Sequence, residues 1–250
     1  MGHKALGDAM TDALGHRAVF SVILPATNVI TEPEMSAIRV PGVTNQTYRF
    51  PFPGRPKGFD DLINLMKPAI SLASECQPDR VIVGFSTEFL PNGLKIASDL
   101  RSYVEDVVQL PTTLASDAVP EALKTLSAER VGIVTPYPPE TNENVYSFFT
   151  DLGYQVTNIT GIAKSNKGRI DTAQVREEEV KTAMAVVDAA EVDVLVQVGS
   201  AMICSGFIAS LEKTHQKSVV AVNAATYWMA LRNHSIADQL KGHGTLFERY

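Results

Sequence analysis

The sequence predicts an α/β protein made of two similar halves, each built on a parallel sheet, with a ligand cleft between them. Short runs rich in Val and Ile alternate with longer segments of helical period, a pattern typical of parallel sheets covered by helices. Two stretches, DRVIVGFST (79–87) and VDVLVQVGSAM (192–202), also resemble each other. This similarity indicates a duplication, although any two parallel strands can look alike.

Seven apolar runs are the expected strands of these sheets. They are bounded by Gly, Pro, Asn, Asp or Ser, and their length of five to seven residues is that of buried strands. In chain order they are AVFSVIL (18–24), RVIVGF (80–85), VEDVVQL (104–110), RVGIVT (130–135), YQVTNIT (154–160), VDVLVQV (192–198) and SVVAV (218–222).

Helices are expected between these strands. Residues 59–73 keep one face apolar, although Pro68 should kink or split that helix. Thr141 is a candidate N-cap for ENVYSFFTDL, Gly153 should close that helix in a left-handed conformation, and residues 175–190 repeat the helical pattern.

The remaining segments set the expected domain boundaries. Residues 39–58 are rich in Pro, Gly and aromatic side chains, which predicts an ordered irregular loop and a candidate lid. We expect an N-terminal extension (1–17), a first half formed by residues 18–115 and 224–250, and a second half formed by residues 116–223.

Composition and charge narrow the classes of function. The chain has 250 residues, 45% of them hydrophobic, which is enough for a full core, and its net charge of -6 gives no basic footprint for nucleic acid. No run of about 18 apolar residues and no signal-peptide pattern is present, so we expect a cytoplasmic protein with no membrane partner. Cys76 and Cys204 form no metal motif, and GHGT and GRI lack a nucleotide-loop context, so we expect no metal and no cofactor.

The residues that follow the expected strands are the candidate ligand contacts, because open parallel sheets bind ligands at the carboxyl ends of their strands. They are rich in hydroxyls, amides and helix-starting N–H groups and poor in Lys, Arg and His, which favours a carboxylate ligand. Helix capping alone is the alternative for each of them. They are Asn28, Ser86, Thr87, Glu88, Thr112, Thr113, Tyr137, Gly199, Ser200, Asn223 and Thr226.

Five stretches together resemble the aspartate/glutamate racemase superfamily, in its branch of maleate cis-trans isomerases and arylmalonate decarboxylases. They are PATNVITEPEM, VGFST, PTTLASDAVPEAL, RVGIVTPYPPETNENVYSFF and VVAVNAATYWMALR, spread over about residues 20–232. The resemblance implies a pseudo-two-fold pair of halves with four-stranded parallel sheets, a small carboxylate substrate between them and a homo-oligomer.

The resemblance also implies roles for individual residues. Asn28 matches the family's early ligand-binding asparagine, Ser86 and Thr87 match the hydroxyl and amide cradle after the first cysteine slot, and Tyr137 matches its carboxylate-binding tyrosine. The family's two catalytic cysteines are missing: Phe85 fills the first slot, and Gly199, or Ser200 in the other register, fills the second.

Cys76, Cys204 and Glu88 are the candidates to replace those thiols. Cys76 precedes its strand and reads as a small core residue, whereas Cys204, four residues after Ser200 on the expected helix, would belong either to the core or to a rearranged site. Glu88 is the better candidate, because a desolvated carboxyl can deliver or remove a proton at a carbanion. A surface acid at a helix N-terminus is its alternative. His16, His215, His234 and His243 lie outside the strand ends and read as surface residues.

The sequence therefore predicts a cofactor-independent enzyme acting on a small mono- or dicarboxylic acid through an enolate-like state, by decarboxylation, isomerisation or a related lyase step. A binding protein that kept the carboxylate pocket without the cysteines is the alternative, and an aromatic substrate lined by Phe85 and Tyr137 fits the decarboxylase side. The predicted catalytic residues are Glu88, Tyr137 and Ser200, and the predicted substrate-binding residues are Asn28, Phe85, Ser86, Thr87, Thr113, Tyr137, Gly199, Ser200 and Asn223.

Overall fold

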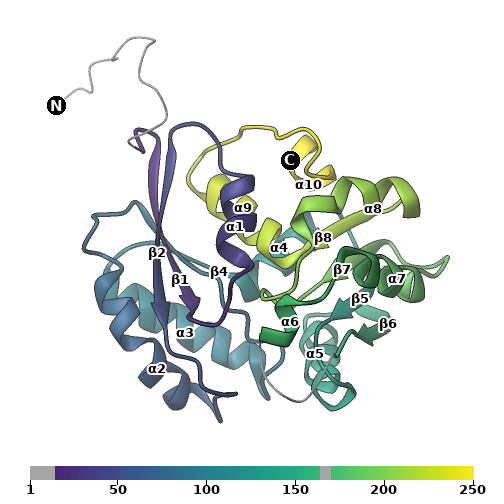
Figure 1. Ribbon diagram of the computed structural model, residues 1–250, viewed down its shortest axis with the longest axis horizontal. Helices are drawn as coiled ribbons and strands as arrows, with labels where there is room; N and C mark the ends of the chain where they lie inside the picture. The colour runs from purple at the N-terminus through teal and green to yellow at the C-terminus, as the bar shows by residue number, and fades with distance from the viewer. Residues whose placement is uncertain (1–14, 164–169) are drawn as a thin grey trace.

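A computed structural model describes residues 15–163 and 170–250 and places two four-stranded parallel sheets in the chain (Figure 1). The predicted fold class is confirmed. The extension predicted for residues 1–17 lies largely outside the described residues. In the described part of the chain, no helix is long and apolar enough to cross a membrane.

The first sheet has the strand order β2-β1-β3-β4, and all neighbours are parallel. The core strands β1 and β3 are almost fully buried, as expected for strands covered by helices on both faces. The strands are β1 (Ala18–Pro25), β2 (Val43–Phe50), β3 (Arg80–Val83) and β4 (Thr112–Leu114).

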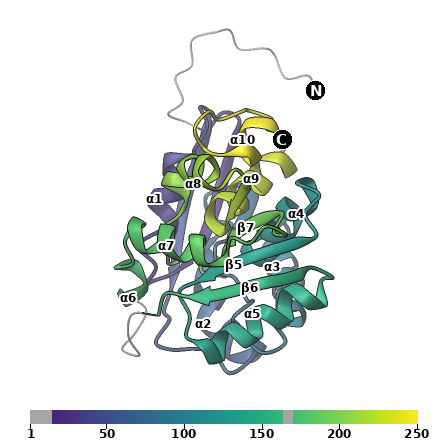
Figure 2. The same cartoon turned by 90° about the vertical axis from the view of Figure 1, so that its right-hand side faces the viewer.

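The second sheet repeats this arrangement with the order β6-β5-β7-β8, again entirely parallel. Figure 2 shows β5, β6 and β7 side by side, with α5 along one face. The strands are β5 (Arg130–Thr135), β6 (Gln155–Gly161), β7 (Val194–Gln197) and β8 (Ser218–Ala221).

Helices cover both sheets, and α9 lies where the halves join. Helix α9 packs against α1 and α4 and also contacts β3, β4 and β8, so it draws strands of both sheets into one hydrophobic core. The helices are α1 (Thr31–Ala37), α2 (Phe59–Leu72), α3 (Gly93–Val108), α4 (Ala115–Thr125), α5 (Pro139–Asp151), α6 (Ile170–Ala173), α7 (Glu177–Val187), the 3₁₀ turn η2 (Ser205–Phe207), α8 (Ile208–His215), α9 (Val222–Asn233) and α10 (Thr245–Arg249).

Two segments differ from the sequence predictions. Residues 104–110, predicted as a strand, belong mainly to α3, because Val104 and Val108 are buried one turn apart while Val107 is 45% exposed, which is a helical period. Residues 39–58, predicted as an irregular loop, contain the edge strand β2, whose Thr, Asn and Gln side chains hide the alternating pattern of a half-buried strand.

The helix breaks and helix ends predicted from the sequence agree with the structure at Gly153 but not at Pro68 or Thr141. Helix α2 continues through Pro68 because its buried face, with Leu62, Met66 and Ile70, packs on the core and offsets the lost backbone bond. Helix α5 begins at Pro139, so Thr141 lies inside its first turn and is not the N-cap. Gly153 has a φ of 91° just beyond the helix end, as predicted.

Candidate active site

Glu88 lies buried where the loop after β3 meets the loop after β7. Its side chain is 2% exposed, and Oε1 accepts a hydrogen bond from Ser86 Oγ at 2.8 Å. The backbone amides of Glu88 and of Gly199 lie close enough to the carboxyl to lower its pKa. A carboxyl from the first half is therefore held against the backbone of the second.

This environment sets the proton affinity of Glu88. Burial disfavours the charged carboxylate and raises the pKa from 4.5 to about 7, and the three hydrogen-bond donors act in the opposite direction without cancelling it. A carboxyl with a pKa near neutrality can both give and accept a proton at physiological pH, which suits a general acid or base.

Gly199 has a backbone shape that only glycine takes easily. Its φ is 92°, and a β-carbon built there would lie 2.5 Å from Pro136 Cδ and 3.2 Å from the Tyr137 hydroxyl. The tight fit brings the Tyr137 hydroxyl close to the amide that meets Glu88. Position 199 is thus enclosed by Pro136 and the Tyr137 hydroxyl, with no room for a side chain.

Asn28 and Ser200 meet across the same junction. Asn28 Nδ2 donates to Ser200 Oγ at 3.2 Å and to Thr31 Oγ1 at 2.8 Å, while its Oδ1 accepts from the backbone amides of Ile30 and Thr31. The Asn28 amide is therefore fixed by its own loop and presented to the loop that carries Ser200.

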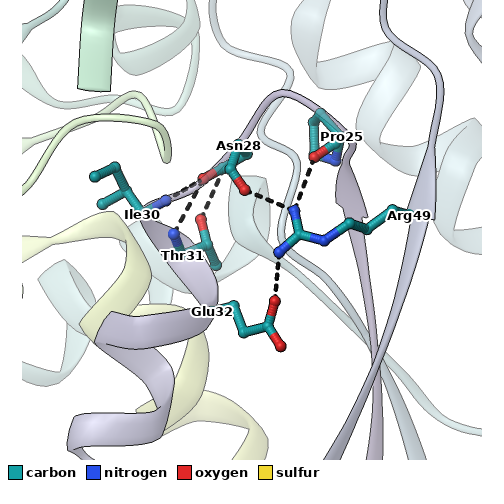
Figure 3. A network of polar contacts seen from close by, with 6 residues as sticks. All are labelled: Pro25, Asn28, Ile30, Thr31, Glu32 and Arg49. Atoms are coloured by element: carbon teal, nitrogen blue, oxygen red, sulfur yellow. Dashed lines mark hydrogen bonds and ion pairs between the residues drawn. The ribbon is translucent and has the colours of Figure 1, made fainter. Parts of the chain in front are cut away.

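Arg49, on β2, holds the other side of the Asn28 loop (Figure 3). Its guanidinium donates to the backbone oxygens of Asn28 at 2.7 Å and Pro25 at 3.3 Å, and it pairs with Glu32 at the start of α1. The position of Asn28 is thus set by a strand, a helix and a loop together.

Aromatic side chains line one side of this junction. Phe85, which fills the first cysteine slot, is 2% exposed, and its ring centroid lies 5.4 Å from that of Phe52 and 5.7 Å from that of Phe89. The Phe89 ring lies 5.4 Å from that of Tyr137. Phe85 and Tyr137, predicted to line an aromatic pocket, therefore belong to one continuous set of rings.

Two residues predicted to bind the substrate, Thr87 and Asn223, hydrogen-bond within the protein itself. The Thr87 hydroxyl donates to Gly93 O at 2.7 Å, and its backbone amide donates to Ser116 Oγ at 2.8 Å, so this residue shapes the turn that carries Glu88. Asn223 Nδ2 donates to the backbone oxygen of Ser200 and to Glu34 Oε2.

Thr113 is placed away from the other candidates. It is a residue of β4 rather than of the loop after a strand, and its hydroxyl accepts from Arg80 Nη1 at 3.3 Å, at the beginning of β3. Arg80 also donates to Asn233 O at the end of α9. Arg80 thus links Thr113 to the end of α9. Thr113 was expected to follow a strand because residues 104–110, which belong mainly to α3, were predicted as that strand.

Of the two cysteines, Cys76 differs from its predicted setting, and Cys204 is a core residue, as the favoured alternative predicted. Cys76 is exposed and is not a core residue. Cys204 is fully buried, but no helix carries it, since it lies just before η2; burial raises its pKa well above the usual range, and its thiol stays protonated.

The four histidines among the described residues, His16, His215, His234 and His243, lie outside this junction. His16 is exposed, but the His215 side chain, predicted to be on the surface, is only 7% exposed and pairs with Asp188 at 2.7 Å. Among the residues that the structure describes, no group of three or more His, Cys, Asp or Glu side chains could hold a metal ion.

Two residues of the junction gave no signal in the sequence analysis. Arg55 lies 5.4 Å above the Phe89 ring and donates to Thr141 Oγ1 at 2.6 Å, so it ties the loop after β2 to α5 of the other half. Glu34, on α1, hydrogen-bonds to the segment that follows Ser200. Arg55 follows β2, which was not predicted as a strand, and Glu34 lies within a helix, so the search along predicted strand ends could not find them.

Comparison with known proteins agrees with this architecture. The sequence profile of arylmalonate decarboxylase matches residues 54–247, which is most of the chain. The chain belongs to the arylmalonate decarboxylase family. Within this family, the arylmalonate decarboxylase of Bordetella bronchiseptica is 26% identical over 200 residues, which cover 77% of this chain and 81% of that protein.

Two solved structures show how widely the fold of this arylmalonate decarboxylase family member is shared. A crystal structure of arylmalonate decarboxylase has a TM-score of 0.79 at 19% identity and covers 93% of this chain and 100% of that one. A cysteine-to-serine variant of the Nocardia farcinica maleate cis-trans isomerase, with a covalently bound succinylcysteine intermediate, has a TM-score of 0.82 at 20% identity and covers 93% of this chain and 98% of that one.

Proposed function

We propose that this protein is a cofactor-independent decarboxylase of malonate-type diacids and that Glu88 is its proton donor. The observation that carries the proposal is the buried Glu88 carboxyl, held between the halves by Ser86 and the Gly199 amide, with a pKa of about 7. Membership of the arylmalonate decarboxylase family supports the reaction class.

The proposed reaction has two steps. The bond between the α-carbon and the departing carboxylate breaks, CO₂ leaves, and the electron pair is delocalised onto the retained carboxylate as an enediolate. Protonated Glu88 then gives its proton to the α-carbon, and the resulting Glu88 carboxylate takes a proton from water before the next turnover.

The surrounding groups suit such an intermediate. The Tyr137 and Ser200 hydroxyls are neutral donors at the same junction, the Ser200 oxygen is held by the Asn28 amide, and donors of this kind stabilise a developing oxyanion. Phe85, Phe89 and Tyr137 provide an apolar side for an aromatic or alkyl substituent on the α-carbon.

Decarboxylation fits these residues better than cis-trans isomerisation does. The related isomerase variant carries a succinylcysteine, which is a covalent thiol adduct. In this chain the resemblance aligns the cysteine slots with Phe85 and with Gly199 or Ser200, none of which is a thiol, while Cys204 is buried with a raised pKa and Cys76 is exposed before β3. A proton donor at Glu88 needs no covalent bond to the substrate.

The test is proton NMR in deuterated water with malonates, arylmalonates and maleate. We expect loss of CO₂ from a substituted malonate with one deuterium at the α-carbon, a Glu88→Gln variant that binds but does not turn over, and an active Glu191→Gln control, which changes an exposed carboxylate. Full activity of Glu88→Gln would overturn the assignment. Saturation-transfer contacts without any turnover would favour a binding protein.

A further inference from the structure

Glu34 makes an unusual set of hydrogen bonds for a helix side chain. Oε1 accepts from the backbone amides of Cys204 and Ser205, both at 2.8 Å. Oε2 accepts from Ser205 Oγ at 2.9 Å and from Asn223 Nδ2 at 2.8 Å. Four donors converge on one partly buried carboxylate, and each donor lies more than 165 residues away along the chain.

These contacts join the two halves at the segment that follows β7, residues 200–205. Glu34 belongs to α1, which follows β1 of the first sheet, whereas Ser205 belongs to the segment after β7 of the second. Asn223, at the start of α9, donates to Glu34 and to the backbone oxygen of Ser200 through the same Nδ2. Thr31, one turn before Glu34, donates to that oxygen at 2.9 Å.

The segment held in this way begins at Gly199. The Gly199 carbonyl accepts from Met202 N at 3.0 Å and from Gln197 Nε2 at 3.1 Å, which closes a turn between β7 and the residues bound by Glu34. We infer that Glu34 is a positioning residue: its carboxylate anchors residues 200–205 so that the Gly199 amide meets the carboxyl of Glu88.

Hydrogen bonds to an ionised carboxylate are stronger than bonds between neutral groups, so an anionic Glu34 gives this segment a stiff anchor. Replacement by Gln would present an N–H₂ group to at least one donor and lose part of the set. This positioning role rests on the proposed function of the same site and extends it. It can be tested without turnover, because the pKa of Glu88 depends on the position of the Gly199 amide.

The experiment is a titration of the Glu88 carboxyl by infrared difference spectroscopy, with the Glu88→Gln protein as the blank that identifies its band. No charged side chain contributes to the pKa of Glu88; burial raises it, and Ser86 and the two backbone amides lower it. In Glu34→Gln the Gly199 amide should withdraw, and the pKa of Glu88 should rise above its wild-type value. An unchanged or lower pKa would overturn the inference.

Glu32→Gln is the matched control. It makes the same chemical change in the first turn of the same helix, but Glu32 pairs with Arg49 and not with residues 200–205. We expect the pKa of Glu88 to stay at the wild-type value in this variant, and an equal rise there would show that charge on α1, not anchoring, is responsible.

Glu34→Asp is the second variant, for use if Glu34→Gln does not fold. It keeps the charge but is one methylene shorter, so it cannot reach all four donors, and the pKa of Glu88 should again rise. A wild-type pKa in Glu34→Asp would count against positioning. If the protein turns over no substrate but these shifts appear, the proposed function fails and the positioning role stands.

Discussion

The backbone amide of Gly199 lies beside the carboxyl of Glu88, a residue more than a hundred positions earlier in the chain, and lowers its pKa. The two residues follow strands of different sheets, β7 and β3. Their meeting places an acid beside Gly199, one of the two positions that the superfamily resemblance aligns with the second thiol. It also means that the acid depends on both halves: one half carries the carboxyl, and the other supplies a donor that tunes it.

Glu88 should lower the stability of the folded protein at neutral and alkaline pH. Its pKa is raised from 4.5 to about 7, so between these values the folded state binds more protons than the unfolded state, and the free energy of unfolding falls as the pH rises. Two and a half pKa units correspond to about 3 kcal/mol, the upper end of the effect.

Urea unfolding of wild type and Glu88→Gln at several pH values measures this effect. The variant should gain stability over wild type as the pH rises from about 4.5 to 7, and the difference should stay constant above that range. If Glu88 were an ordinary surface acid, the two curves would run parallel at every pH.

Activity should depend on the same titration. A proton donor must be protonated, so kcat/KM for decarboxylation should fall as the pH rises through about 7, with the slope of a single ionisation. A pH–rate profile between 5 and 9 tests this. A rate that increases with pH across the range would assign Glu88 the role of a base instead.

The cysteines should react very differently with thiol reagents. Cys76 is exposed, whereas Cys204 is fully buried and protonated because burial raises its pKa. In the native protein, a chromogenic disulfide should therefore titrate one thiol rapidly, and the second only after unfolding. Cys204→Ala should keep its activity, and loss of turnover in that variant with an unchanged fold would return Cys204 to the catalytic site.

The sequence was sufficient to predict the architecture and most of the junction, because a buried parallel strand is recognisable from a short local run of apolar residues. Val-rich runs located β3 and β7, and the rule that ligands meet strand ends then pointed to Asn28, Glu88 and Ser200. Thr113 was misplaced because a buried helical face, Val104–Val108, reads as a strand when it is rich in Val.

Glu34 and Arg55 could not be predicted in the same way. Their partners lie far away along the chain, 170 or 171 positions for the two backbone amides bound by Glu34 and 86 positions for Thr141. Only the packing of one half on the other brings these pairs together, and nothing in the residues beside Glu34 or Arg55 encodes that packing.

Glycine at position 199 should be required for stability as well as for the site. Gly199→Ala would hold an L side chain at a φ of 92° and press its β-carbon against Pro136, so we expect a loss of roughly 1–3 kcal/mol. Gly206→Ala is the control, since a β-carbon there would meet open space and should change stability by less than about 0.5 kcal/mol. Equal losses in the two variants would mean that the tight turn at Gly199 is not the cause.

Arg55 should matter for activity more than for folding. Its side chain is exposed, but its bond to Thr141 and its contact with Phe89 hold the loop that carries Phe52 against Phe85. Arg55→Ala should lower kcat/KM about fivefold, the equivalent of one hydrogen bond of about 1 kcal/mol, while the midpoint of thermal unfolding changes little.

Two further variants separate this bridge from a general effect of charge. Lys57→Ala removes an exposed cation of the same loop and should leave kcat/KM unchanged. Thr141→Val removes the acceptor of the Arg55 bond, so its effect should not add to that of Arg55→Ala if the two residues act as a pair. Additive losses in the double variant would show that Arg55 acts through another contact, and the bridge between the loop and α5 would then carry no part of the activity.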